Sequence, residues 1–120
     1  MNNIDDLNKE TDCETCKYEE LGFDRIANAL SIISGKWTLK LLYIIGFHKV
    51  IRYGEIRRQA APITHKMLST QLKELEKNGL IIRTEYPQVP PKVEYSLSDK
   101  GWGLFPMFDA LFNWIVEYDV

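Results

Sequence analysis

The sequence predicts an α+β domain that is mainly α-helical, and three patterns carry this prediction. Apolar residues recur at helical spacings of three and four over most of the chain. Pro62 separates two short helical segments, because proline cannot continue a helix. Two β-rich segments joined by a proline-rich loop come next, and they predict a hairpin.

The first helix is predicted from Phe23 to the Ser34-Gly35 pair. Ile26, Leu30 and Ile33 recur there at spacings of four and three, so they mark one buried face. The preceding residues, 1–22, are acidic and lack hydrophobic periodicity. They are expected to form a mobile N-terminal arm or a loosely docked helix, with the folded domain over residues 23–120.

The second helix is predicted to run through WTLKLLYIIG and to end at Gly46, because glycine suits the position after a helix. Lys36 lies at its start. The residues expected to point inward are Trp37, Leu41, Leu42 and Ile45. A short strand is expected next, over Val50 to Arg52.

Two short helices on either side of Pro62 follow. The first covers Tyr53 to Ala60 and places Arg57 and Arg58 outside. Thr64 is a good N-cap for the second, which is expected from about His65 to Asn78. Gly79 then suits the position just beyond its end.

The second of these helices has two different faces. Leu68, Leu72 and Leu75 form a narrow apolar stripe that can pack on a core. The polar side chains cluster roughly 120° away around the helix. They are His65, Lys66, Ser69, Thr70 and Lys73. One face is therefore available for packing, and a polar, basic face is available for a partner.

The hairpin is predicted from Leu80 to Tyr86 and from Val93 to Leu97. Pro87, Pro90 and Pro91 stiffen the loop between its strands, and Arg83 and Lys92 lie on its flanks. Helix, turn, helix and hairpin in this order make a winged helix-turn-helix.

Ser98 is expected to cap a last helix that reaches about Tyr118 and that Pro106 kinks or splits. The apolar residues of this helix cover more than one stripe, and a chain of 120 residues has little surface with which to bury them. This predicts a homodimer interface. The expected interface residues are Phe105, Phe108, Leu111, Phe112, Trp114 and Ile115. In the alternative interpretation, the first two helices cover these aromatic residues within one subunit.

Composition excludes several classes of function. The sequence has no glycine-rich phosphate loop, no metal-ligand spacing and no nucleophile-base pair, so neither an enzyme nor a metal or cofactor is expected. No apolar run reaches the roughly 20 residues that a membrane span requires. The polar N-terminus does not resemble a signal peptide, so a cytoplasmic location is the default expectation.

The net charge of −2 conceals a basic segment, because residues 49–97 carry nine bases and five acids. An α-helix fits the major groove of DNA, so the polar face after Pro62 is expected to reach base edges of double-stranded DNA. Arg57 and Arg58 are expected over phosphates, Arg83 and Lys92 along the flanking backbone or minor groove, and Lys36 at a phosphate beside its helix start. Two alternatives stay open: an ordinary solvated face, and a winged-helix protein-interaction module that does not bind DNA.

Four segments carry a resemblance to a known family: GKWT, EIRR, ITHKMLSTQLKELEKNGL and YPQVPPKVEYSLSDKG. They resemble the HxlR-type transcriptional regulators, relatives of the MarR winged-helix group, from about Phe23 to the C-terminus. The resemblance implies a bacterial homodimer on an inverted-repeat operator, built through N-terminal and C-terminal dimerisation helices. It also implies base recognition by the polar face and wing contacts by Arg83 and Lys92. It identifies no small-molecule effector.

Cys13 and Cys16 form a CETC motif in the acidic arm. Two thiols alone cannot complete a tetrahedral zinc site, and the neighbouring acids disfavour the thiolate form. Many regulators of the resembled family carry a reactive cysteine upstream of the GKW tryptophan, at a spacing that falls on Asp24 in this chain. Redox or electrophile sensing by Cys13 and Cys16 stays open beside a structural or incidental role.

Overall fold

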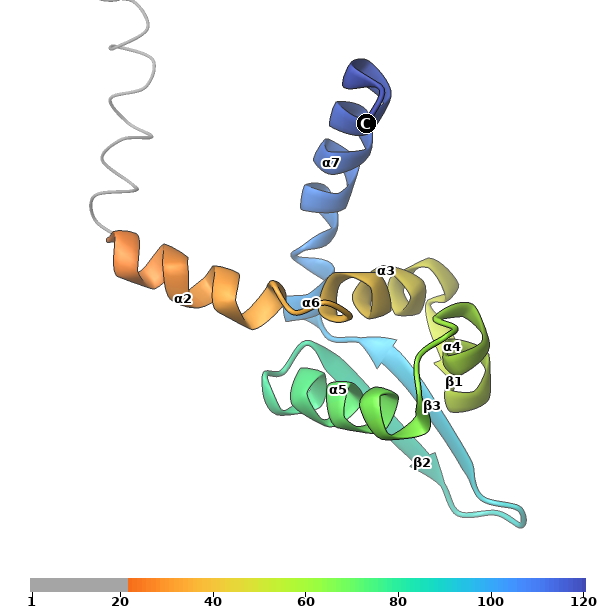
Figure 1. Cartoon of the computed structure of the whole chain (residues 1–120). Coiled ribbons are helices and arrows are strands. Elements are labelled where there is room, and N and C mark those ends of the chain that lie inside the picture. The colour runs from red at the N-terminus through yellow and green to blue at the C-terminus, as the bar shows by residue number, and fades with distance from the viewer. Residues whose placement is uncertain (1–21) are drawn as a thin grey trace, which may run out of the picture. The chain divides into compact units, whose positions relative to one another are not determined.

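The computed structural model describes residues 22–120, which divide into two compact units at Ser34 and Gly35 (Figure 1). The first unit contributes one described helix, α2 (Phe23–Ile33). The second unit, residues 35–120, contains every other described element. Cys13, Cys16 and nearly all of the predicted arm lie outside the described residues.

Helix α2 has the predicted bounds but not the predicted burial. Ile26 and Ile33 are half-buried, Leu30 is 54% exposed, and no residue of the helix is buried. The spacing of apolar residues identifies which face of a helix is apolar, but it does not identify what covers that face.

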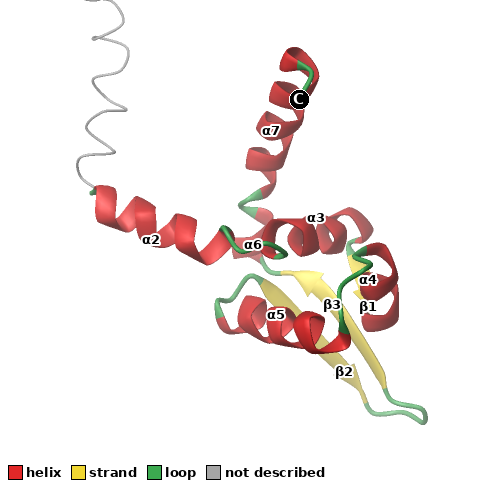
Figure 2. Cartoon of the chain, in the orientation of Figure 1, coloured by secondary structure: helices red, strands yellow, loops and turns green. Residues whose placement is uncertain are grey.

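The second unit has the predicted order of elements. Figure 2 shows its helices in red and its strands in yellow. Residues 22–120 are mainly helical with one small sheet, so the predicted α+β winged helix-turn-helix is confirmed. The elements are α3 (Thr38–His48), β1 (Val50–Arg52), α4 (Tyr53–Gln59), α5 (His65–Lys77), β2 (Ile81–Tyr86), β3 (Lys92–Leu97), α6 (Asp99–Trp102) and α7 (Phe105–Tyr118).

The sheet has the strand order β1-β3-β2, and both pairs are antiparallel. Tyr95 of the central strand lies opposite Ile51 on one side and Arg83 on the other. Tyr95 and Leu97 are buried on the face that the helices cover, together with Ile81 of β2. The positions of Arg83 and Tyr95 are therefore fixed by the same ladder.

Helix α5 is held by its leucines and by its two ends. Leu68, Leu72 and Leu75 are at most 2% exposed and belong to the main hydrophobic core. Burial of side chains of this size contributes about 1.5–3 kcal/mol each. At the N-terminus the Thr64 hydroxyl accepts a hydrogen bond of 3.1 Å from the Met67 amide, as predicted for an N-cap. Gly79 has a positive φ of 74°, as expected beyond the helix end.

Two details of the helices differ from the prediction. Helix α3 does not end at Gly46 but continues to His48. Gly46 is buried, and a Cβ atom there would collide with the ring of Phe105, so this glycine is required for space rather than as a stop. Lys36 lies in the turn before α3, whose N-cap is Trp37.

The predicted last helix is split into two helices. Pro106 was expected either to kink this helix or to split it. Helix α6 ends at Trp102 and α7 begins at Phe105, with Pro106 in the first turn of α7, where its missing N–H group removes no helical hydrogen bond. The first turns of α7 pack on α3, because Phe105 and Phe108 lie 6.1 and 5.3 Å from Tyr43 between ring centroids. The remaining predicted interface residues, Leu111, Phe112, Trp114 and Ile115, are exposed in the chain.

No single helix in the described part of the chain is both long enough and apolar enough to cross a membrane, and α2 and α3 reach that threshold only when counted together.

Candidate nucleic-acid interface

The polar face of α5 is open to solvent, because the leucine ridge of Leu68, Leu72 and Leu75 holds the opposite face in the core. His65, Lys66, Thr70 and Lys73 are exposed, and Ser69 is half-buried. Their side of the helix faces away from the core because Leu68, Leu72 and Leu75 occupy the buried side. The Thr70 hydroxyl donates to the Lys66 carbonyl oxygen at 2.8 Å, which leaves its oxygen lone pairs available as acceptors.

Tyr53, a residue that the sequence reasoning missed, ties this face to the preceding helix. Its hydroxyl lies 3.1 Å from His65 Nδ1, 3.2 Å from the His65 carbonyl oxygen and 3.2 Å from Ser69 Oγ. Its ring stacks on the His65 imidazole at 5.9 Å, with 2° between the planes. One phenol thus fixes the first turn of α5 on α4. The only signal of this role in the sequence is a tyrosine at the start of a basic helix. That signal does not show that the partner of Tyr53 is His65, twelve residues further along the chain.

The two arginines of α4 differ in how freely they can bind a phosphate. Arg58 forms an ion pair with Glu55 one turn earlier. Arg57 forms no salt bridge with any residue in the range 22–120. Both line a hollow of about 490 Å³ that His65 of α5 also lines. The hollow therefore carries two guanidinium groups from α4 and an imidazole from α5.

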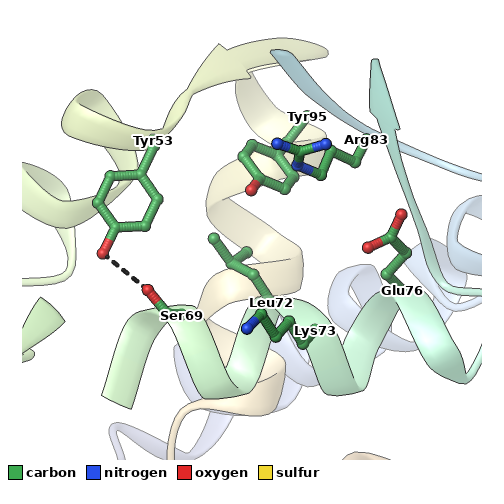
Figure 3. Close-up of a pocket in the computed structure, with 7 residues that line it drawn as sticks. All are labelled: Tyr53, Ser69, Leu72, Lys73, Glu76, Arg83 and Tyr95. Atoms are coloured by element: carbon green, nitrogen blue, oxygen red, sulfur yellow. Dashed lines mark hydrogen bonds between the residues drawn. The ribbon is translucent and has the colours of Figure 1, made fainter. Parts of the chain in front are cut away.

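The cations of the hairpin are partly balanced by their neighbours. Lys92 lies 3.4 Å from a carboxylate oxygen of Glu94 and 5.0 Å from the ring centroid of Tyr86. Glu94 also accepts a hydrogen bond from Tyr86, and this raises the pKa of that phenol. Arg83 lies 3.7 Å from Glu85, and its hydrogen bond to Tyr95 raises the pKa of the guanidinium. Arg83 faces α5 rather than the outer flank of the hairpin (Figure 3).

Two other parts of the surface bear on the predicted contacts. Lys36 and Lys40 both lie over the Trp37 ring, at 5.4 and 5.5 Å from its centroid. At the hairpin tip Val89 is 100% exposed between prolines. No group of three or more potential metal ligands occurs in the described part of the chain.

Known proteins share both the sequence and the fold. A family model described as HxlR-like helix-turn-helix matches residues 32–119. The HTH-type transcriptional regulator YdzF of Bacillus subtilis is 48% identical over 99 residues, which cover 82% of this chain and 88% of YdzF. A crystal structure of a MarR-family transcriptional regulator from Porphyromonas gingivalis is 40% identical, with a TM-score of 0.71, over 77% of this chain and 89% of its own. The redox regulator HypR in its oxidised form is 40% identical, with a TM-score of 0.70, over 77% of this chain and 94% of its own.

Removal of the Tyr53 hydroxyl tests whether this group positions α5. Tyr53→Phe keeps the ring, so we expect a normal fold and a loss of about 1 kcal/mol in the free energy of unfolding. Chemical denaturation measures this loss, and nitrogen chemical shifts of the His65 imidazole report its tautomer. The matched control is Tyr118→Phe, because the Tyr118 phenol makes no hydrogen bond within the described residues. Equal stability of the two variants, with an unchanged His65 imidazole, contradicts the assignment.

Proposed function

Because the chain belongs to the HxlR-like helix-turn-helix family of transcriptional regulators, we propose that it binds specific DNA sequences as a homodimer, with α5 in the major groove. The observation that carries the proposal is the exposed polar face of α5 above a fully buried leucine ridge. The family and the relatives are regulators of transcription, so this chain is a regulator and not an enzyme.

Base recognition is assigned to the polar face of α5. Lys66 and Lys73 can donate to guanine O6 and N7, Thr70 can accept from a base amino group, and Ser69 can donate to or accept from several bases. Neither lysine forms a salt bridge with a described residue, so neither must leave a protein partner in order to bind DNA. His65 lies at the first position of the helix, where a neighbouring phosphate is also favoured.

Phosphate contacts are assigned to cations around that face. Arg57 is the strongest candidate on α4, because Arg58 already has a carboxylate partner. Lys36 and Lys92 are weaker candidates, since Lys36 lies over the Trp37 ring and Lys92 lies beside Glu94. These contacts set register on the duplex without reading its sequence. They also make binding fall as salt rises, because each one releases condensed counterions.

Homodimer formation is assigned to α7. Its outer residues include Leu111, Phe112 and Trp114, which are 43%, 64% and 50% exposed. An apolar groove of about 210 Å³ runs beside them, lined by Tyr43, Phe108, Leu111, Phe112 and Ile115. A surface of this kind is covered in a stable protein. A two-fold symmetric dimer would then read an inverted repeat, with half-sites about one helical turn apart. Such a regulator works where the chromosome is, which in a bacterium is the cytoplasm.

A protein-interaction module without DNA binding is the alternative. Such a module has no need to keep Lys66, Lys73 and Arg57 exposed and free of acidic partners. The described part of this chain does so. This observation favours DNA as the partner.

A redox response is the second element of the proposal, and it rests on the two thiols of the CETC motif. HypR, a protein similar to this chain, is described as a redox regulator. In this chain Asp24 occupies the position at which the resembled regulators carry a reactive cysteine, so we assign any thiol response to Cys13 and Cys16. Both cysteines lie outside the described residues.

Lys66→Ala tests the DNA-binding face. Wild-type protein is expected to bind a duplex from its own upstream region in preference to unrelated DNA at moderate salt. The variant should lose about 1–3 kcal/mol of specific binding, measured by fluorescence anisotropy, if Lys66 contacts a base. Lys40→Ala is the control, since it removes the same charge from an exposed position of α3. Absence of specific binding by a correctly folded wild-type protein contradicts the proposal, as does equal binding by both variants.

Phe112→Glu tests the interface. Introduction of a charge at a buried dimer contact should weaken association by about 2 kcal/mol or more, which moves sedimentation velocity profiles from dimer toward monomer. The fold should persist, because Phe112 is 64% exposed in the single chain. Val89→Glu makes a similar change at the hairpin tip and should remain dimeric. A monomeric wild-type protein, or a Phe112→Glu dimer as stable as the Val89→Glu dimer, argues against α7 as the interface.

Cysteine variants test the redox response. Operator affinity should differ between protein reduced with dithiothreitol and protein oxidised with hydrogen peroxide. The difference should disappear in the Cys13→Ser and Cys16→Ser variants if the two thiols form one disulfide. Anisotropy titration at fixed salt measures both states. Equal affinity before and after oxidation, or a difference that survives in both variants, removes the assignment.

A further inference from the structure

A half-open cleft of about 380 Å³ lies between α5 and the β2–β3 hairpin (Figure 3). Ser69, Lys73 and Glu76 line it from α5, since their spacing of four and three places them on one flank of the helix. Arg83 and Tyr95 line the opposite wall, and Tyr53 closes one end. Base recognition does not account for this cleft, because Arg83 and Tyr95 belong to the sheet rather than to the helix that enters the groove.

The side chains of the cleft suit a phosphate group. Lys73 and Arg83 provide two cations on opposite walls, and an arginine can hold two phosphate oxygens at once. The hydroxyl groups of Ser69 and Tyr53 lie 3.2 Å apart at one end, so a rotation of either group offers a further donor. Glu76 is the one acid among the lining residues. The cleft therefore carries one positive charge in excess.

Arg83 is oriented but not strongly engaged. Arg83 lies opposite Tyr95, which is buried in the central strand, and both side chains face α5 across the cleft (Figure 3). Its nearest carboxylate oxygen, on Glu85, is 3.7 Å away, and the Arg83 and Glu85 side chains are 38% and 61% exposed. Surface pairs of this kind contribute little. A phosphate can therefore replace Glu85 as the partner at small cost.

The geometry of the duplex brings a phosphate to this cleft. A sugar-phosphate strand separates the major groove from the neighbouring minor groove, and the two grooves differ in width, about 12 Å and 6 Å. If α5 occupies the major groove and the hairpin occupies the next minor groove, the two elements lie on either side of one strand. The gap between them must then receive the backbone of that strand.

We infer that the cleft between α5 and the hairpin is a phosphate-binding site for one phosphodiester of the DNA strand that separates the two grooves. Arg83 and Lys73 hold this phosphate, and for Lys73 the phosphate contact takes the place of the base contact assigned to it above. The inference rests on the proposed function and adds a defined contact to it. Glu76 repels the same phosphate and keeps the contact weak enough to exchange. A free phosphate or a phosphorylated small molecule has the same chemistry, so the experiment must separate these sources.

Replacement of single phosphates in the duplex tests the site. Methylphosphonate linkages, which carry no charge, are introduced one at a time along a duplex that wild-type protein binds. We expect one linkage in each half-site at which the substitution weakens binding about tenfold, the equivalent of one neutralised contact. Arg83→Gln should bind modified and unmodified duplexes equally at that linkage, with a salt slope lower by about one. The control, Arg52→Gln, changes an exposed arginine on the opposite edge of the same sheet and should retain the tenfold effect.

A gain of affinity provides the second readout. Glu76→Gln removes the acid from the cleft and should tighten DNA binding several-fold, because a Coulomb repulsion is lost. Glu74→Gln removes the same charge from the flank of α5 that faces away from the hairpin and should change affinity less. Equal gains for both variants overturn the inference, because they would reflect net charge alone.

Inorganic phosphate separates the two sources of the ligand. Phosphate is compared with chloride at the same ionic strength as a competitor of DNA binding. If phosphate competes more strongly, if Arg83→Gln abolishes this difference, and if no linkage in the duplex is coupled to Arg83, the cleft binds a free anion. That result would overturn the backbone assignment. Specific DNA binding with no linkage coupled to Arg83 overturns the inference but leaves the proposed function intact. Absence of specific binding by every correctly folded variant would instead reject the proposed function itself.

Discussion

The burial of three leucines determines how the rest of this surface is presented. A helix turns about 100° per residue, so once Leu68, Leu72 and Leu75 are held in the core, every other side chain of α5 has a fixed direction. Lys66, Thr70 and Lys73 then point to solvent, and the flank with Ser69 and Glu76 faces the hairpin. Thr64 at the N-terminus and Tyr53 across the turn fix the same rotation through hydrogen bonds. The loss of this ridge would release all of these directions together.

Local charge matters more in this chain than the total. The formal net charge is −2, which gives no indication of a polyanionic partner. Within the described part of the chain, however, some cations have carboxylate neighbours and others do not. Arg58 and Lys92 have them, whereas Arg57, Lys66 and Lys73 form no salt bridge there. These three cations lie on the two helices of the helix-turn-helix. The sum over the chain conceals this separation because the field near a surface depends on nearby charges.

The features predicted correctly from the sequence depend on neighbours along the chain. Pro62, the Thr64 cap and the leucine spacing fixed the bounds of α5 almost to the residue, and the alternation of Val93, Tyr95 and Leu97 located β3. The features that were missed depend on residues far apart. Gly46 was expected to end a helix, but its role is set by Phe105. The hydrogen bonds of Tyr53 and the orientation of Arg83 toward α5 likewise require the packed fold. The same holds for α2, since no local signal specifies what covers an apolar face.

The break at Gly103 and Leu104 makes the direction of α7 depend on the backbone angles of two residues. Helix α7 has 14 residues, so its far end lies about 21 Å from the break at 1.5 Å of rise per residue. A rotation of about 10° at the break moves that end by about 4 Å, which is comparable to the spacing between adjacent base pairs. In a dimer joined through α7, small changes of backbone angle at two residues would thus alter the separation of the two reading heads.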